Sequence, residues 1–459
     1  PLTLQPYPTY RGSLIPWLDE LPAHWKCERA KNLFDKVIRP IRSVDEVITC
    51  FRDGVVTLRK KRRLSGFTEA LFEFGYQGIR RGDLVIHAMD AFAGAIGVSD
   101  SDGKGTPVYL VCVPKSNANT HFYAHLIREM AREGWIQALS RGIRERSTDF
   151  RYDVFRTQFL PVPPVDEQIA IGRFLKHEHQ RIDRVIRAKK RLIGLLNEQK
   201  QAIIHRAVTR GLNPNVPLKP SNLPWLGQIP HHWQVLRSKH IFREVDTRSA
   251  TGLETHLSMS QKLGLIPHAE LDGKRLISES YVGAKLCLPG DLVLNRLKAH
   301  LGVFALAPVA GLVSPDYTVF RPIVQIDPRY FLAVYRTPSC RVELRQRAKG
   351  IVQGFWRLYT PDFNDIKVPF PPLQEQHEII SRLDGDLERL NQAIETAERE
   401  ISLLREYRTR LTADVVTGKL DVREAAAQLP DIEEPVRPGV EPTDEEGEEV
   451  LDDAEVSEA

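Results

Sequence analysis

The sequence has no long hydrophobic run and is poor in cysteine. No stretch of eighteen apolar residues occurs in its 459 positions, and the first residues are polar and rich in proline, so we expect neither a membrane-spanning segment nor a secretory signal. The five cysteines are scattered and never form a Cys-x-x-Cys pair. That distribution argues against a disulfide scaffold or structural zinc and indicates a reducing, cytoplasmic environment.

Motifs that would carry catalysis are missing as well. Residues 97–105 come nearest to a phosphate-binding loop, but one residue too many precedes the Gly-Lys pair and no Ser or Thr follows it, which indicates a turn. Residues 327–330, Asp-Pro-Arg-Tyr, resemble the Asp-Pro-Pro-Tyr of amino-methyltransferases, yet no glycine-rich loop for S-adenosylmethionine precedes them. A helix start is therefore favoured there over a catalytic loop. His121 and His125 have the i, i+4 spacing of metal ligands without a third ligand nearby, which favours a partly exposed helix face.

Charge is divided unevenly along the chain. From Asp431 onward there are thirteen acidic residues and one arginine, a net charge of −12, whereas the whole chain has a net charge of +4. The other 430 residues therefore carry +16, and a basic body of this kind favours a nucleic-acid partner. We expect residues 421–459 to form an acidic, disordered tail, which either only aids solubility or competes weakly with nucleic acid for the basic surface.

The chain does contain one sequence motif that occurs twice, 208 residues apart. The segment Pro161-Val-Pro-Pro-Val-Asp-Glu-Gln168 matches Pro369-Phe-Pro-Pro-Leu-Gln-Glu-Gln376, and more than forty residues without proline follow each copy. Proline is tolerated just before a helix but not inside one. Two long helices are therefore predicted, one after each proline cluster.

Both predicted helices carry apolar residues at alternating steps of three and four, which is the period of a coiled coil. The first seam is the poorer one, because it also contains His179, Lys189 and Lys200. At about 1.5 Å per residue each helix is roughly 65 Å long, and an apolar stripe of that length has to be buried. An antiparallel coiled coil of the two copies is predicted, with separate docking of each helix on its own domain as the alternative. The predicted seam comprises Leu175, Ile182, Ile186, Ile193, Leu196 and Ile203 in the first helix and Leu383, Leu387, Leu390, Ile394, Ile401, Leu404 and Leu411 in the second.

The predicted fold class is α+β, with two mixed α/β domains that are related by a pseudo-twofold axis and separated by the two long helices. Apolar runs bounded by glycine indicate strands, and apolar spacing of three and four indicates helices. The predicted strands are residues 83–87, 109–113, 291–295 and 317–320, and the predicted domain helices are residues 122–135 and 328–347. The predicted boundaries are 1–160 for the first domain, 161–212 for the first helix with its proline-rich entry, 213–368 for the second domain, 369–420 for the second helix with its entry, and 421–459 for the tail.

The two copies share their framework but differ in polar and aromatic residues of the kind that contact nucleic acid. A run of five positive charges, residues 59–63, could neutralise several phosphates, although such a run is usually only a solvated turn. The second copy instead has arginine and lysine after its strand 291–295 and a Gln-Gly-Phe-Trp stretch at residues 353–356. Arginine and glutamine can make paired contacts with base edges, and aromatic side chains can stack or wedge. The candidate DNA-binding residues are Arg59, Lys61, Arg63 and Thr68 in the first domain and Arg296, Lys298, Gln353 and Trp356 in the second.

The doubled Pro-Pro-x-x-Glu-Gln motif, with a long helix after each copy, resembles the specificity subunit of type I restriction-modification systems. So does the doubled motif Trp-Leu-x-x-(Leu/Ile)-Pro-x-His-Trp that ends at Trp25 and Trp233. The resemblance extends from about Pro16 to Leu420. It implies that each domain is a target-recognition domain for one half of a bipartite double-stranded DNA site and that the paired helices set the gap between the halves. It also implies that the chain itself catalyses nothing and holds no cofactor.

The same resemblance implies the partners of the chain. Two modification subunits, which hold S-adenosylmethionine and methylate adenine, would bind the long helices and their proline-rich entries, and restriction subunits that use ATP and magnesium would join that core. Two alternatives stay open: a diverged DNA adenine methyltransferase that acts on its own through residues 327–330, and a coiled-coil scaffold that touches no DNA. The residues expected to bind other subunits are Pro163, Pro164, Glu167, Gln168, Pro371, Pro372, Glu375 and Gln376.

Overall fold

The computed structural model describes residues 4–62, 74–115, 117–140, 149–260, 263–270, 280–350 and 356–430. The predicted site residues Arg63, Thr68 and Gln353 lie outside these ranges, as do residues 431–459 of the predicted tail 421–459. The described chain divides into two compact units. Unit 1 extends to Lys189 and resumes at Arg399, whereas unit 2 comprises Lys190–Glu398.

Unit 1 is built around a four-stranded antiparallel sheet with the strand order β4-β11-β8-β9. Two-stranded ribbons accompany it, namely β1-β2, β12-β3, β5-β6 and β10-β7, and helix α2 lies against β8 and β9. In chain order the elements are β1 (Tyr10–Ile15), β2 (Leu18–Pro22), β3 (Lys26–Arg29), α1 (Ala30–Leu33), β4 (Phe34–Lys36), β5 (Ile48–Cys50), β6 (Val56–Leu58), η1 (Arg59–Lys61), β7 (Gln77–Ile79), β8 (Leu84–His87), η2 (Ala91–Ala93), β9 (Ile96–Val98), β10 (Gly103–Gly105), β11 (Tyr109–Pro114), α2 (Thr120–Arg132), α3 (Trp135–Leu139), α4 (Tyr152–Phe155) and β12 (Phe159–Val162).

Unit 2 repeats this architecture. Its central antiparallel sheet has the order β16-β23-β20-β21, and its ribbons are β13-β14, β15-β24, β17-β18 and β19-β22. In chain order the elements are β13 (Leu218–Pro220), β14 (Gln228–Pro230), β15 (Gln234–Arg237), η3 (Ser238–His240), β16 (Phe242–Val245), β17 (Leu257–Ser260), β18 (Gly264–Pro267), η4 (His268–Glu270), β19 (Lys285–Cys287), β20 (Leu292–Asn295), η5 (Arg296–Leu301), β21 (Phe304–Leu306), β22 (Gly311–Val313), β23 (Tyr317–Pro322), α6 (Pro328–Arg336), α7 (Pro338–Arg347), α8 (Thr360–Asn364) and β24 (Lys367–Phe370).

The predicted strands are confirmed as β8, β11, β20 and β23, which form the middle of the two central sheets. The single helix predicted over residues 328–347 is wrong, because the structure breaks it into α6 and α7. Thr337 has extended backbone geometry and its side chain accepts a hydrogen bond from the backbone N–H of Cys340, while Pro338 occupies the first turn of α7. Proline suits the start of a helix but removes a donor from its interior, so the break falls there.

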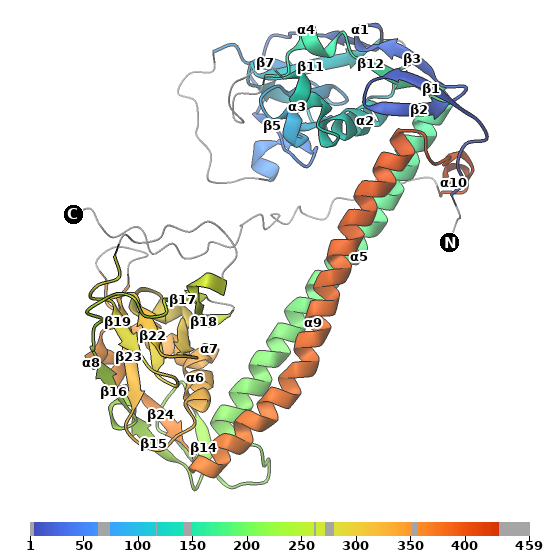
Figure 1. Ribbon diagram of the computed structural model, residues 1–459. Helices are drawn as coiled ribbons and strands as arrows, with labels where there is room; N and C mark the ends of the chain where they lie inside the picture. The colour runs from blue at the N-terminus through green and yellow to red at the C-terminus, as the bar shows by residue number, and fades with distance from the viewer. Residues whose placement is uncertain are drawn as a thin grey trace. The chain divides into compact units, whose positions relative to one another are not determined.

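The two long helices are α5 (Val165–Arg210) and α9 (Leu373–Val416), which lie side by side in Figure 1. Within unit 1, His179 Nε2 lies 2.9 Å from Thr412 Oγ1 and Arg408 pairs with Asp183 at 2.9 Å. Rising residue numbers on α5 meet falling numbers on α9, so the helices are antiparallel there. Lys200 Nζ donates to Asn391 Oδ1 at 2.5 Å in unit 2 with the same polarity.

Side chains of both long helices that are buried or half-buried recur every three or four residues, with exposed positions between them. On α9 the pattern includes Leu383, Leu387, Leu390 and Ile394 in unit 2. Removing such a stripe from water is what makes a long isolated helix stable. None of the helices in the described part of the chain has both the length and the apolar character required to cross a membrane.

Each unit completes its hydrophobic core with the end of a long helix that started in the other unit. Leu411 and Val415 of α9, together with Val422 and with Ala425 and Ala426 of the short helix α10 (Arg423–Ala427), are buried in the core of unit 1. The prediction that the disordered tail starts at residue 421 is therefore wrong, because apolar residues after that position still pack into this core. Ala207 and Val208, near the end of α5, are buried in the core of unit 2. The last turn of each long helix is therefore part of a globular core.

Candidate functional site

A buried glutamate anchors the start of the first long helix. Helix α5 begins directly after the proline cluster and has Glu167 in its first turn. The Glu167 side chain is only 3% exposed, accepts hydrogen bonds from Trp25 Nε1 at 2.9 Å and Tyr7 Oη at 2.5 Å, and lies 2.8 Å from His24 Nε2. Because the helix dipole favours negative charge in the first turn, this carboxylate holds the entry of α5 against the N-terminal strands.

Unit 2 contains the equivalent anchor. Glu375, in the first turn of α9, accepts a hydrogen bond from Trp233 Nε1 at 2.9 Å and lies 2.8 Å from His232 Nε2. Its side chain is 24% exposed, and no tyrosine of the described residues takes the place of Tyr7. The two tryptophans that end the repeated opening motif thus have a definite partner, which is the glutamate of the repeated proline motif.

The glutamine after each of these glutamates joins the long helix to a domain helix. Gln168 Oε1 accepts a hydrogen bond from the backbone N–H of Asn119, and Gln376 Oε1 accepts one from the backbone N–H of Asp327, each at 2.9 Å. Asn119 and Asp327 are the residues that cap the first turns of α2 and α6. The Nε2 group of each glutamine donates to a carbonyl of its own proline cluster. The motif therefore fixes three elements of each unit together.

The residues predicted to bind other subunits differ in exposure. Glu167, Gln168 and Gln376 are buried and are hydrogen-bonded inside their own units. Pro164 and Pro372 are exposed. Subunit binding by this motif stays a prediction, and the exposed prolines with the residues beside them are the part of it that another protein could touch.

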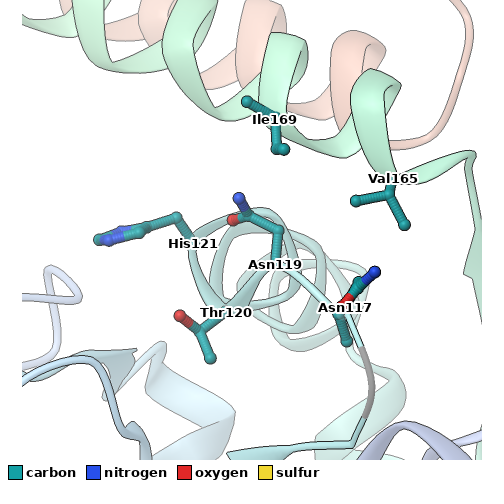
Figure 2. Close-up of a pocket in the computed structure, with 7 residues that line it drawn as sticks. Asn117, Asn119, Thr120, His121, Val165 and Ile169 are labelled. Atoms are coloured by element: carbon teal, nitrogen blue, oxygen red, sulfur yellow. The ribbon is translucent and has the colours of Figure 1, made fainter.

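An apolar pocket lies next to the first proline cluster. It has a volume of about 420 Å³ and is bounded by the start of α2 and the first turns of α5, as Figure 2 shows. Val165 and Ile169 line its α5 side and are 37% and 51% exposed, while Asn119 and His121 line its α2 side. Exposed aliphatic side chains on a rigid helix beside a cavity are typical of a protein-binding surface.

The predicted DNA-binding residues of unit 1 that the structure describes lie in the turn η1, directly after β6. Arg59 Nε donates to Thr49 Oγ1 at 3.3 Å. Lys61 Nζ donates to Ser101 Oγ at 2.5 Å and lies 3.4 Å from the Asp100 carboxylate. These contacts hold both side chains on the domain, and their contact with DNA stays a prediction.

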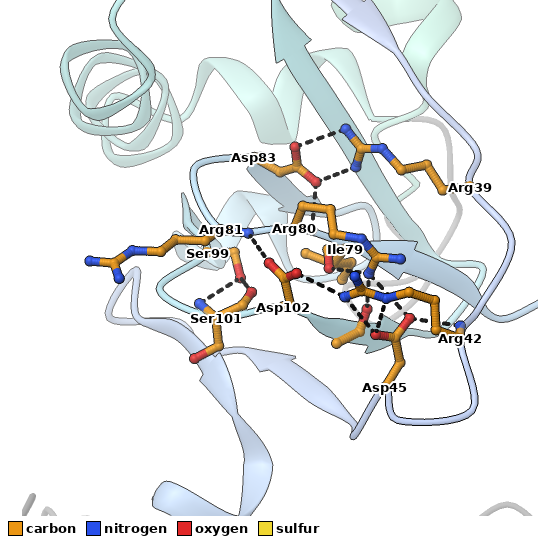
Figure 3. Close-up of polar contacts among 11 residues, drawn as sticks. Arg39, Arg42, Asp45, Ile79, Arg80, Arg81, Asp83, Ser99, Ser101 and Asp102 are labelled. Atoms are coloured by element: carbon orange, nitrogen blue, oxygen red, sulfur yellow. Dashed lines mark hydrogen bonds and ion pairs between the residues drawn. The ribbon is translucent and has the colours of Figure 1, made fainter.

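In a second cluster of unit 1, aspartate carboxylates of the same unit pair with the arginine side chains. Arg80 donates to Asp45 at 3.1 Å, and Arg42 pairs with Asp45 at 3.0 Å and Asp102 at 2.8 Å, as Figure 3 shows. Burial raises the pKa of Asp45, but the hydrogen bonds from Arg42 and Arg80 outweigh it and the pKa lies below its usual value. These arginines therefore stabilise the turn between β7 and β8.

In unit 2 the predicted residues gather at η5, the turn after β20. Arg296 Nε donates to Asp316 O at 2.6 Å, and the backbone N–H of Leu358 donates to Arg296 O at 3.1 Å. The segment that follows Trp356 thus lies beside η5, with the guanidinium of Arg345 5.0 Å from the Trp356 ring centre. Within the described residues, the ammonium group of Lys298 has no hydrogen bond or ion pair.

The segments weighed as catalytic motifs have structural roles. The side chain of Asp327 accepts a hydrogen bond from the backbone N–H of Arg329 at 2.9 Å, so the predicted helix start is confirmed. A turn connects β9 to β10 within residues 97–105, as predicted. In the ranges that the structure covers, no three histidine, cysteine, aspartate or glutamate side chains form a group suited to a metal ion.

Comparison with known proteins finds the same resemblance. The family model of the type I restriction modification DNA specificity domain matches residues 277–403, which run from unit 2 into α9. The resemblance to type I specificity subunits is thereby confirmed. The specificity subunit of the type I restriction enzyme MjaX from Methanocaldococcus jannaschii is 20% identical over 439 residues, covering 88% of this chain and 96% of that protein. The MjaVIII specificity subunit of the same organism is 21% identical over 309 residues, covering 64% of this chain and 68% of that protein.

A similar fold is also found among solved structures. A chain solved in work on complex assembly and conformational transition of the type I R-M system superposes with a TM-score of 0.62. It is 17% identical and the match covers 87% of this chain and 99% of that chain. At this identity the likeness concerns the fold, and it agrees with the predicted α+β class with two long helices.

Sequence reasoning missed one group of side chains that is part of neither the motif nor the predicted DNA-binding set. His121, His125 and Arg128 lie on one face of α2 and line a second, smaller pocket. The sequence signal for this group is the spacing of four and three along the helix, which extends from the two histidines to Arg128.

Proposed function

We propose that this chain is the DNA-recognition subunit of a type I restriction-modification complex and that each unit reads one half of a bipartite double-stranded DNA site. One observation carries the proposal: the two units share a sheet order and a helix anchor but carry their candidate polar residues at different places, at η1 after the ribbon strand β6 in unit 1 and at η5 after the central strand β20 in unit 2. A common framework with unlike side chains suits a protein that reads two different short sequences. The family resemblance supports the same function.

DNA affinity in such a subunit comes mainly from phosphate contacts, and specificity comes from a few contacts with base edges. In unit 2 the two candidate cations differ. Arg296 is held by Asp316, which would fix its direction for a base contact, whereas Lys298 has no partner among the described residues and suits a phosphate. Trp356, beside the guanidinium of Arg345, offers a surface for stacking.

The partners are part of the proposal. Two modification subunits would dock at the proline-rich entries and the long helices, and in unit 1 the pocket with Val165 and Ile169 supplies an apolar surface for that contact. S-adenosylmethionine would be held by the modification subunits, and ATP with magnesium by restriction subunits. The paired helices α5 and α9 would set the spacing of the two half-sites.

The test is to express the chain with its modification subunits in a host that lacks them and to map methylated adenines. A single bipartite motif is the expected result. Arg296→Ala should relax the requirement at one half-site and leave the other intact, whereas Lys298→Ala should weaken methylation of all sites about equally. Methylation without any sequence motif, or loss at both half-sites in the Arg296 variant, contradicts the assignment of half-sites to units.

Docking is tested by copurification. Ile169→Asp, which places a charge in the apolar pocket, should reduce the amount of modification subunit recovered with the chain. Ile38→Asp is the matched control, because Ile38 is also an exposed isoleucine of unit 1, 76% accessible, and lies outside the pocket and outside both long helices. Equal recovery with both variants would show that this pocket is not used.

The alternative of an independent methyltransferase is tested by calorimetric titration of the isolated chain with S-adenosylmethionine. We expect no binding, because Asp327 is already engaged as the cap of α6. Saturable binding that Asp327→Ala removes would favour the alternative.

A further inference from the structure

A small pocket in unit 1 gathers three basic side chains. It has a volume of about 180 Å³ and lies between helix α2 and strand β9. His121, His125 and Arg128 enter it from one face of α2, because their spacing of four and three corresponds to successive helical turns. Among the described residues that line the pocket, none is acidic.

The Arg128 guanidinium is held in this pocket without a counter-ion. Within the described residues its Nε is buried and has no hydrogen-bond partner, and Nη2 makes a single long hydrogen bond to Arg52 O at 3.4 Å. The Asp53 carboxylate, whose charge also acts on Arg128, is paired with Arg62 at 2.6 Å. Burial lowers the pKa of Arg128. A buried cation without a paired carboxylate is costly, so the pocket could be stabilised by a negative charge that a ligand supplies.

Within the described residues, the ring nitrogens of both histidines have no hydrogen-bond partner. In the part of the chain that the structure describes, neither His121 nor His125 forms a hydrogen bond through its ring, and His125 packs edge-on against the His179 ring with 5.4 Å between ring centres. Burial, followed by the positive charge of its neighbours, lowers the pKa of His125 to about 3. At neutral pH each ring therefore keeps one N–H donor. Guanidinium and imidazole N–H groups together form a donor set that suits an oxyanion.

The repeat provides an internal comparison. The counterpart of Arg128 is Arg336, 208 residues later, and its guanidinium donates from Nε to Phe304 O on β21 at 3.1 Å and from Nη2 to the same oxygen. The counterpart of His125 is Ala333. The counterpart of His121 is Arg329, which pairs with Asp384 at 3.0 Å. Unit 2 thus satisfies the equivalent cations internally, so the open arrangement in unit 1 is not a requirement of the shared fold.

From these observations we infer that the pocket of unit 1 binds a phosphate-class oxyanion, with Arg128 as the charged donor and His121 and His125 as additional N–H donors. The phosphate is either a phosphodiester of the DNA backbone or a free phosphate. Only the DNA source rests on the proposed function. Binding of free phosphate by the chain is independent of it.

The experiment is calorimetric titration of the full chain with inorganic phosphate at pH 7.5, with sodium chloride holding the ionic strength constant. We expect saturable binding by the wild type and at least tenfold weaker binding by Arg128→Gln. Arg132→Gln is the matched control, because Arg132 lies one turn further along α2, outside the pocket, and pairs with Glu129. Unchanged affinity in Arg128→Gln, or no saturable binding by the wild type, overturns the inference.

A second variant guards against misfolding. His125→Ala introduces the residue that unit 2 has at the equivalent position, so the fold should tolerate it, and thermal melting in chloride checks that it does. We expect it to weaken phosphate binding several-fold. If a folded His125→Ala and a folded Arg128→Gln both bind phosphate as the wild type does, the pocket is not the site.

The source of the phosphate is distinguished by repeating the titration with the chain saturated by duplex DNA. Loss of the phosphate signal identifies a backbone phosphodiester as the occupant, and an unchanged signal identifies a free phosphate. Failure of the proposed function would appear separately, as methylation without a motif, and would leave the phosphate titration of the free chain unaltered.

Discussion

At the scale of single residues, the two glutamates of the proline motifs each accept several side-chain hydrogen bonds. The Glu167 side chain is 3% exposed and contacts the polar groups of Trp25, Tyr7 and His24. The Glu375 side chain is 24% exposed and contacts those of Trp233 and His232. The motif is therefore a means of fixing a helix to a domain. Any subunit that binds there would contact a surface already fixed by these bonds.

Replacing these glutamates should destabilise the protein to different extents. Glu167→Ala leaves a buried indole N–H and a buried phenol without an acceptor, which should cost roughly 3 kcal/mol in the free energy of unfolding. Glu375→Ala should cost clearly less, because its site is more exposed and lacks the phenol. Urea unfolding followed by tryptophan fluorescence measures both. Equal losses would show that the hydrogen bonds at Glu167 contribute little beyond those at Glu375.

His179 is a polar residue at a seam position where the second copy has Leu387. Burial, followed by the charge of Arg408, lowers the pKa of His179 from 6.5 to about 4, while Asp183 acts in the opposite direction. His125 and Thr412 also contact its ring. The unfolded chain therefore binds a proton below pH 6.5 that the folded chain does not, and this lowers stability as pH falls from 6.5 towards 4.

His179→Leu should remove that pH dependence. At pH 7.5 we expect a change of no more than about 1 kcal/mol, since the new side chain gains burial but loses the contact with Thr412. At pH 5 the variant should exceed the wild type by a larger margin. Unfolding in urea at the two pH values measures the difference. A margin that is the same at both would show that His179 titrates normally in the folded chain.

At the scale of elements, the long helices could be predicted from the sequence because their signals are local. Proline at the entry, the absence of proline afterwards and apolar residues at three and four all act within a few turns. The helices observed, Val165–Arg210 and Leu373–Val416, follow the predicted spans closely. The prediction of a single helix over residues 328–347 was wrong, because the helical spacing of apolar residues continues past Pro338, where a new helix begins.

Glycines within and at the end of the long helices should respond in opposite ways to substitution. Gly194 and Gly385 are inside helices, and an added Cβ would meet nothing within 4 Å. Alanine at either should raise stability by roughly 0.5–1 kcal/mol. Gly418, after the end of α9, has a φ of +80°, and a Cβ there would lie 2.5 Å from Pro22 Cδ.

Gly418→Ala should therefore lower the thermal unfolding midpoint, whereas Gly194→Ala and Gly385→Ala should raise it. Differential scanning calorimetry of the three single variants measures the shifts. A stabilising Gly418→Ala would mean that α9 does not end against the strands of unit 1 in the way the structure has it.

At the scale of the whole molecule, charge is the property that the sequence gives most directly. Residues 431–459 carry −12 and the remainder carries +16. Deleting residues 431–459 should raise affinity for non-specific duplex DNA at least about threefold at low ionic strength, because the net charge that attracts phosphates increases. Fluorescence anisotropy at several salt concentrations measures it.

A full-length variant with the acidic residues after position 430 replaced by their amides is the matched control. It should behave as the deletion does, since it removes the charge and keeps the length. If only the deletion raised the affinity, charge would not be the cause.

The sequence by itself determined the duplication, the two long helices and the α+β class, because each depends on periodicity and on residues close together in the chain. The tertiary structure decided which side chains of those elements contact one another. Trp25 donates to a glutamate 142 residues away, and the core of unit 1 is completed by Leu411 and Val415. Within the described residues, Arg128 Nε is left without the carbonyl acceptor that Arg336 Nε has. Such contacts join residues far apart in sequence, and no local pattern encodes which of the available partners a buried polar group will find.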